Sequence, residues 1–270
     1  HTSFSNTLNR SGSSYNVNDV QRQAKGTYKV IFKTAFETAD YQVGVSTAHP
    51  LEFAYVAEKN DMPFEQVIHL LEGMLTTIKI DTNSDEYIIF LSGRSNFRND
   101  VAKIAKYKGG RKVEKPKFFY EIRKYMKENY HTFYVHGAEA DDLVAIYQTQ
   151  FENTIICSDD KDLLQVPGYH YNMRTKEIRE IDEEEGNYRL YLQLLTGDRT
   201  DNIKGIEGIG PAKAKKILEA VNPDEYQVEC LRQYVNKYGE DGIRQCKETY
   251  RLIYMMRETN IELPKAKEWK

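Results

Sequence analysis

Three short apolar segments with helix-like stretches between them constrain the fold of this chain most strongly. They are Tyr87–Leu91, Thr132–Val135 and Thr154–Cys157. Short apolar runs are typical of strands buried on both faces, and strands that alternate with helices form parallel sheets covered by those helices. Apolar residues at helical spacing from Phe64 to Ile78 predict one covering helix. The sequence therefore predicts an α/β fold with a parallel-sheet core.

The two ends of the chain differ from this core. Residues 1–25 are rich in Ser, Asn and Thr, which predicts a disordered or loosely attached polar tail. The β-prone run Tyr28–Phe32 is expected to be the first strand of the core, and strand character fades after Thr196. We therefore expect a tail at 1–25, an α/β core at 26–185 and a helical module at 186–270.

Composition restricts the setting in which the chain works. The 270 residues include three cysteines, none in Cys-x-x-Cys spacing, so neither a disulfide framework nor a zinc site is expected. We therefore expect the protein to work in a reducing cytoplasm. No apolar run approaches the ~18 residues of a membrane span, so we expect no membrane partner. The net charge of -3 hides segregation, because bases gather between Arg98 and Lys127 and acids follow. Such a pattern suggests a polyanion held near metal ions.

The most specific acidic group opens a helix rich in Ala, Leu, Val and Ile, where Glu139, Asp141 and Asp142 stand close together. One reading is helix capping, because acids favour the positive end of the helix dipole. Three crowded carboxylates with no Lys or Arg nearby in sequence repel one another, and a divalent cation would remove that cost. We therefore favour metal binding over capping.

Two further acidic groups follow along the chain. Asp160 and Asp162 come directly after the strand at 154–157, where open α/β sheets gather their ligands. A polar turn capped by Asp is the alternative. Asp198 and Asp201 come just before a glycine-rich turn. Metal binding is again the favoured interpretation.

The glycine-rich turn predicts a grip on a DNA backbone. Its glycines free backbone N–H groups, and a helix that starts at Pro211 points its positive end at the neighbouring site. Phosphate is the natural occupant, and a plain loop is the alternative. The residues expected to contact DNA there are Gly205, Gly208, Gly210, Lys213 and Lys215.

Taken in order, these motifs resemble those of the 5′-nucleases, which include phage flap endonucleases and the nuclease domain of bacterial DNA polymerase I. The resemblance covers about Glu86 to Ala220 and rests on Glu139–Asp142, Asp160–Leu163 and Gly197–Leu218. It implies a PIN-like α/β core, a helical arch at about 98–127 and a C-terminal helix-three-turn-helix module.

The resemblance also assigns a role to the stretch Tyr107–Arg111, which would form a gateway for the 5′ strand. Lys108 and Arg111 would then be catalytic residues at the scissile phosphate, and we expect Tyr107 and Lys112 to contact DNA. From the residues alone, this is a basic segment with interleaved aromatics, suited to phosphates and stacked bases, or else a solvated basic face.

The predicted activity is that of a structure-specific 5′-nuclease that hydrolyses DNA with a 5′ flap or 5′ end. It would use two Mg²⁺ or Mn²⁺ ions. One ion would be held mainly by Glu139, Asp141 and Asp142, and the other by Asp160, Asp162, Asp198 and Asp201. A monovalent cation at the helix-three-turn-helix, a monomeric state, a replication polymerase as partner and a bacterial or phage-infected cytoplasm are further expectations.

The chain also departs from the family pattern. The family carries one acid on the first strand and another after the strand at Tyr87–Leu91. Here Ala24–Lys29 contains no acid, and Leu91 is followed by Ser92 and Gly93. These departures favour one alternative, a DNA-structure-binding homologue with lost or weakened cutting. An RNase or toxin-like nuclease and a structural protein with acidic turns explain fewer of the motifs.

Overall fold

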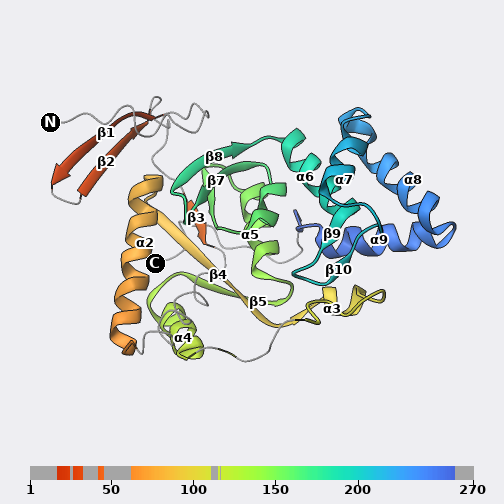
Figure 1. Cartoon of the computed structure of the whole chain (residues 1–270). Helices are drawn as coiled ribbons and strands as arrows, with labels where there is room; N and C mark the ends of the chain where they lie inside the picture. Colours follow the sequence, from red (N-terminus) through yellow and green to blue (C-terminus); the bar gives the residue numbers. More distant parts are fainter. Residues whose placement is uncertain are drawn as a thin grey trace.

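The computed structural model describes residues 17–24, 27–32, 42–45, 62–110, 115 and 117–258, with backbone alone for the first three stretches and residue 94 (Figure 1). Its core is a six-stranded sheet of order β5-β4-β3-β6-β7-β8. The strands are β3 (Gln42–Val45), β4 (Glu86–Asn96), β5 (Thr132–Gly137), β6 (Thr154–Cys157), β7 (Gly168–Asn172) and β8 (Glu177–Ile181). Only the β7–β8 pair is antiparallel. The predicted parallel-sheet core is confirmed.

Helices cover both faces of this sheet. On one face lie α2 (Phe64–Thr82) and α4 (Phe119–Asn129), and on the other lies α5 (Ala140–Gln150). The side chains of β4 show why both faces need cover. Ile89 and Leu91 pack with α2 and α4, whereas Ile88 and Phe90 pack with α5. Side chains alternate between faces along a strand, so a continuous apolar run requires cover on both sides.

The centre of the sheet is β3, and the prediction that Tyr28–Phe32 is the first core strand was wrong. Gln42 of β3 pairs with Glu86 of β4 and with Thr154 of β6. β2 (Thr27–Phe32) pairs instead with β1 (Val17–Ala24) in a separate antiparallel sheet. Residues 17–24 of the predicted tail form β1, residues 1–16 lie outside the described part, and the loose attachment of the tail stays a prediction. Apolar content predicts that a segment is a strand, but its partner depends on distant residues.

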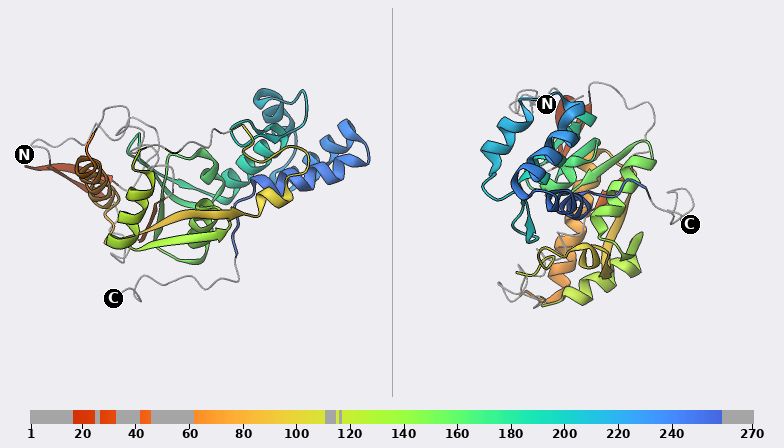
Figure 2. Two further views of the ribbon diagram at one scale, coloured as in Figure 1. Left: turned by 90° about the horizontal axis from the view of Figure 1, so that it is seen from below. Right: turned by 90° about the vertical axis from the view of Figure 1, so that its right-hand side faces the viewer.

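The helices that follow β8 build a second apolar cluster beyond one end of the sheet, as Figure 2 shows. The elements are α6 (Glu183–Thr196), β9 (Gly197–Asp198), β10 (Ile203–Lys204), α7 (Pro211–Leu218), the 3₁₀ turn η3 (Pro223–Glu225), α8 (Tyr226–Tyr238) and α9 (Asp241–Ile253). Leu194, Tyr234 and Leu252 lie in this cluster. The boundary predicted between residues 185 and 186 falls inside α6.

From the last turn of α9 the chain returns to the sheet as a C-terminal strap, which we define as residues 252–257. Arg98, on the short helix α3 (Arg98–Val101), donates hydrogen bonds to the carbonyl oxygens of Leu252 and Tyr254 (2.8 and 3.0 Å). The Gln165 side chain, at the end of the 3₁₀ helix η2 (Lys161–Gln165), both donates to and accepts from the strap backbone (3.0 Å each). The strap therefore fastens the helical cluster to the α/β core.

A buried histidine makes the stability of this fold depend on pH. His170 of β7 is 4% exposed, and its Nε2 lies 2.7 Å from the carbonyl oxygen of Val166, to which the neutral ring donates. Burial lowers the pKa of His170 to about 4. Between pH ~6.5, where the unfolded histidine titrates, and pH ~4, only the unfolded chain gains this proton. Stability therefore falls as the pH falls through that window, by ~3 kcal/mol.

The variant His170→Gln tests this expectation, because glutamine can still donate to Val166 but does not titrate. Urea unfolding of both proteins at several pH values isolates the histidine, since other groups contribute equally to each. The variant is expected to lose less stability than the native chain between pH 6.5 and 4. Parallel curves for the two proteins over this range would contradict the assignment.

Candidate active site

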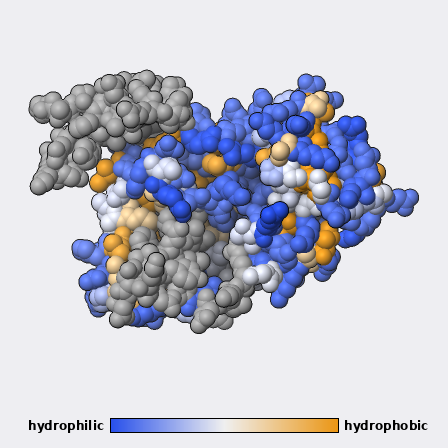
Figure 3. Space-filling view, in the orientation of Figure 1, coloured by the Kyte–Doolittle hydropathy of each residue, from blue (hydrophilic) through white to orange (hydrophobic). Residues whose placement is uncertain are grey.

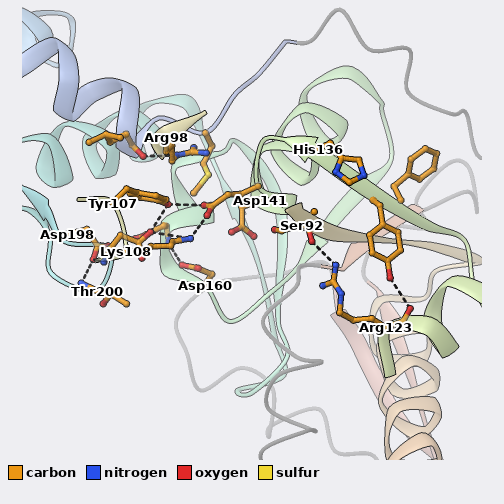
Figure 4. Close-up of a pocket in the computed structure, with 18 of the residues that line it drawn as sticks. Ser92, Arg98, Tyr107, Lys108, Arg123, His136, Asp141, Asp160, Asp198 and Thr200 are labelled. Atoms are coloured by element: carbon orange, nitrogen blue, oxygen red, sulfur yellow. Dashed lines mark hydrogen bonds and ion pairs between the residues drawn. The ribbon is translucent and has the colours of Figure 1, made fainter. Parts of the chain in front are cut away.

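A cavity of about 1270 Å³ runs along β5 and the second half of β4 and reaches Asp160, beyond the carboxyl end of β6. Figure 4 shows Lys108 and several acids at one end, and Ser92, Arg123 and His136 at the other. The cavity brings together acids from three separate parts of the sequence. Those that line it are Glu139, Asp141, Asp160, Asp162, Asp198 and Asp201.

Lys108 and Tyr107 both contact the same two acids, Glu139 and Asp201. The Lys108 ammonium pairs closely with Glu139 and lies 3.6 Å from Asp201. The Tyr107 hydroxyl, whose ring is 5% exposed, donates to Asp201 (2.9 Å) and Glu139 (3.0 Å). Asp201, which was predicted to hold a different ion from Glu139, thus shares both of its partners. The division of the acids between two metal ions stays a prediction.

Asp141 has a different environment. Burial, then the neighbouring charges of Asp160 and Glu139, raise its pKa to about 8. The nearby Lys108 ammonium lowers this pKa but does not cancel the rise. Asp160 caps η2 with a carboxylate oxygen that accepts from the Asp162 N–H (2.9 Å). A further cation in this part of the cavity would favour the ionised form of Asp141.

Asp162 and Asp198 form a coupled pair next to it. Burial and then the charges of Asp160 and Asp198 raise the pKa of Asp162. For Asp198, burial opposes ionisation, but hydrogen bonds from the Asp201 N–H, Asp162 and the Thr200 N–H outweigh it and lower its pKa. The two backbone donors lie at 3.1 and 2.6 Å. Asp198 is therefore the ionised member, and its turn geometry is fixed by these contacts.

Asp142 does not fit its predicted role as a metal ligand. It is 0% exposed, and both oxygens accept from Arg98 (2.5 and 2.7 Å). One oxygen also accepts from the Glu139 N–H, as half of a capping box, and the other from the Met256 N–H. The metal interpretation assumed that no base was near in sequence. Arg98 supplies that base from another element, and it is buried rather than part of a DNA-facing stretch.

The donor set of the cavity suits a hard divalent cation, because Mg²⁺ and Mn²⁺ prefer carboxylate oxygen. Among the described residues, however, no group of three or more acid, imidazole or thiol side chains is arranged to hold a metal as it stands. Lys108 already compensates Glu139. A metal at Asp141, Asp160 and Asp162 therefore fits the chemistry, but it requires these side chains to turn toward one another.

Ser92 lies within β4, directly after Tyr87–Leu91, where the family pattern has an acid. Its hydroxyl accepts a hydrogen bond from the Ala140 N–H (2.9 Å) at the start of α5. It therefore caps this helix instead of adding a charge to the cavity. The strand at the sheet centre, Gln42–Val45, contains no acid either.

The far side of the cavity is a basic wall, which we define as Lys115, Phe119, Tyr120, Arg123, Lys124 and Lys127. The Arg123 guanidinium lies 5.4 and 5.0 Å from the ring centres of Phe119 and Tyr134, and donates to the Ser92 carbonyl (2.6 Å). Tyr120 is 69% exposed. Within the part of the chain that the structure describes, no carboxylate pairs with Lys115, Arg123 or Lys127. The sequence showed this basic stretch, but not which of its members face the acids.

Other predicted residues lie elsewhere. The residues predicted to grip the DNA backbone do not line the cavity: Gly205, Gly208, Gly210, Lys213 and Lys215. Gly205 must be glycine, because a Cβ there would lie 2.3 Å from the Gly197 nitrogen. Gly210 caps α7, which begins with Pro211 as predicted. Arg111 and Lys112 lie outside the described residues.

The surface around the site is largely polar. In the face drawn in Figure 3, hydrophilic side chains predominate over the C-terminal helices, with a few apolar patches. Among the described helices, none combines the length and apolar character that crossing a bilayer would require.

Acidic and basic side chains that line one cavity suit a phosphate-bearing ligand held together with metal ions. The family model described as the 5′-3′ exonuclease N-terminal resolvase-like domain matches residues 46–190. The 5′-3′ exonuclease of Mycoplasmopsis pulmonis is 30% identical over 232 residues, which cover 78% of this chain and 77% of that protein. The chain belongs to the 5′-3′ exonuclease family.

Other similarities are partial. The DNA polymerase I of Rhizobium leguminosarum is 42% identical over 96 residues, which cover 31% of this chain and only 9% of the polymerase. Among solved structures, the T5 D15 protein co-crystallised with metal ions has a TM-score of 0.59 at 17% identity, covering 79% of this chain and 89% of that one. The T5 D15 flap endonuclease in a pseudo-enzyme-product complex with DNA and metal ions scores 0.51 at 15% identity, covering 79% and 99%. At these identities the likeness shows the fold.

Proposed function

We propose that this protein is a divalent-metal-dependent 5′-nuclease that hydrolyses DNA with a 5′ flap or a free 5′ end. The observation that carries the proposal is the single cavity, in which acids such as Asp141, Asp160 and Asp162 face the basic wall. Acids suit the metal ions of phosphodiester hydrolysis, and bases suit the phosphate backbone. The T5 relative of the same fold, solved with DNA and metal ions, supports this reading.

The side chains have separate parts in this reaction. A water oxygen bonds to phosphorus as the bond to the leaving sugar oxygen breaks, and two bound Mg²⁺ or Mn²⁺ ions would activate the water and stabilise the leaving oxygen. Burial and repulsion favour the protonated forms of Asp141 and Asp162, and these carboxyl groups would hold a divalent cation only after losing those protons. Lys108 lies beside these acids and would stabilise charge on the phosphoryl oxygens.

Cleavage of a labelled 5′-flap duplex with Mg²⁺ or Mn²⁺ tests this proposal. The native protein is expected to release a short 5′ product. The double variant Asp160→Asn, Asp162→Asn keeps the shape of both side chains but removes their charge, and it is expected to bind the flap without cutting. A pure, folded native protein that never cuts with either metal would refute the catalytic claim.

A DNA-structure-binding protein without cutting is the second candidate. Two observations favour it: Ser92 caps α5 instead of supplying an acid, and Lys108 compensates Glu139. The same assay separates the two candidates. This second candidate predicts flap binding that is unchanged by Asp160→Asn, Asp162→Asn, and no product from either protein.

The basic wall gives a quantitative expectation for DNA affinity. Lys124 and Lys127 are exposed and line the cavity, so their replacement by alanine removes phosphate contacts without disturbing the core. Log K for single-stranded DNA decreases with log salt, and this decrease is expected to be less steep by about 1.4 if both contacts are lost. Lys176→Ala, at an exposed turn outside the cavity, is the control with an unchanged slope. Equal slopes for the native protein, the Lys124 and Lys127 variant and Lys176→Ala would show that the basic wall does not contact DNA.

A further inference from the structure

Two turns that are far apart in sequence meet beside the acids. One is the turn at Lys106–Gly109, closed by the Gly109 N–H donating to the Lys106 carbonyl (3.0 Å). The other is the tip of the β9–β10 hairpin, where the Asn202 N–H donates to the Arg199 carbonyl (3.3 Å). The first turn carries Lys108, and the second carries Asp201. Their contact therefore decides where the Lys108 ammonium lies.

Two hydrogen bonds join the turns on either side of Tyr107. The Lys108 N–H donates to the Asp201 carbonyl (2.8 Å). The Asn202 side-chain amide donates to the Lys106 carbonyl (2.9 Å). Only the NH₂ end of the amide can make the second bond, because its partner is an acceptor. The Asn202 side chain therefore bonds directly from the hairpin tip to the backbone of the Lys106–Gly109 turn.

The backbone at Lys108 needs such support. Lys108 has φ of 53°, in the left-handed region that non-glycine residues rarely adopt. Asn202 has φ of 58°, but asparagine tolerates this region because its short side chain bonds locally. A strained residue persists when its surroundings fix it. The Asn202 bond, one residue before Tyr107, is part of what fixes Lys108.

We propose that Asn202 is a positioning residue that holds the Lys106–Gly109 turn so that the Lys108 ammonium stays at Glu139 and Asp201. It touches neither the acids' carboxylates nor the expected path of the phosphate, and it acts through Lys108. The kinetic part of this inference rests on the proposed nuclease function. Its structural part, the placement of Lys108, does not.

The variant Asn202→Gly removes the amide and keeps a residue that adopts positive φ without strain. We expect kcat on a 5′-flap duplex to fall about 10-fold, because small misplacements of a catalytic group are costly. KM and the urea midpoint should change little. In a Lys108→Ala background the same substitution should have no further effect on kcat. Asn83→Gly, at an exposed left-handed asparagine that ends α2, is the matched control with native kinetics.

Amide hydrogen exchange gives a readout that does not need activity. The Lys108 amide is expected to exchange faster in Asn202→Gly than in the native protein and in Asn83→Gly. Unchanged exchange at Lys108, or an equal fall of kcat in the presence and absence of the Lys108 side chain, would overturn the inference. If the native protein does not cut DNA, the nuclease proposal fails, and the exchange experiment alone still decides whether Asn202 places Lys108.

Discussion

Replacing Arg98 by methionine is expected to lower the free energy of unfolding by ~3–5 kcal/mol, because it leaves the Asp142 carboxylate buried without its partner. Arg98 is 1% exposed and Asp142 is 0% exposed, so water cannot replace the lost bonds. The substitution also removes the two hydrogen bonds that Arg98 donates to carbonyl oxygens of the C-terminal strap. Urea unfolding monitored by circular dichroism measures the change.

Removing the charge of Asp142 as well distinguishes the effect of an unpaired buried charge from simple loss of packing. Adding Asp142→Leu to Arg98→Met removes the unpaired charge, so the double variant is expected to regain part of the lost stability. Lys215→Met is the surface control, because Lys215 pairs with Glu219 in solvent and should change the midpoint little. If Arg98→Met were no less stable than Lys215→Met, the pair would not hold the core as described.

Replacing Lys108 by alanine is expected to have opposite effects on metal binding and on cleavage. The ammonium compensates Glu139 and Asp201, so its loss exposes two carboxylates to incoming cations and should tighten Mn²⁺ binding. Cleavage of a 5′-flap duplex should nevertheless fall by about 10²–10³-fold, because the charge that stabilises the transferring phosphoryl group is gone.

Titration calorimetry with Mn²⁺ and single-turnover cleavage measure these two quantities separately. Lys108→Arg keeps the charge and should restore weaker Mn²⁺ binding, but its larger planar head should recover only part of the rate. Lys176→Ala, outside the cavity, should leave both unchanged. Weaker Mn²⁺ binding in Lys108→Ala would contradict the competition between lysine and metal.

The sequence predicted the elements better than their partners. Apolar runs such as Tyr87–Leu91 identified strands because burial on both faces leaves no polar position, and the position of Asp160 after a strand placed it at the ligand edge of the sheet. The central strand Gln42–Val45 was missed, because it is short and holds a glycine and a glutamine, whereas Tyr28–Phe32 is more strongly β-prone. A pairing that depends on two distant strands leaves no local signal.

Charges show the same limit at the site. Local spacing predicted that Glu139, Asp141 and Asp142 lie close together, and all three do lie at the start of α5. It could not show that Arg98 neutralises one of them, because the two partners are 44 residues apart. The role of Tyr107 as a shared donor to Glu139 and Asp201 was hidden for the same reason. Long-range ion pairs are set by the fold and not by neighbours in sequence.

The C-terminal strap has a consequence for how a substrate enters. The cavity is lined both by ends of the sheet and by Leu252 and Ile253 of the strap region, so it lies across the joint that the strap fastens. Opening the two parts like a hinge would break the charge-assisted bonds of Arg98 and the two bonds of Gln165 together. A substrate of the proposed nuclease is therefore expected to enter the cavity without a hinge opening of the two parts.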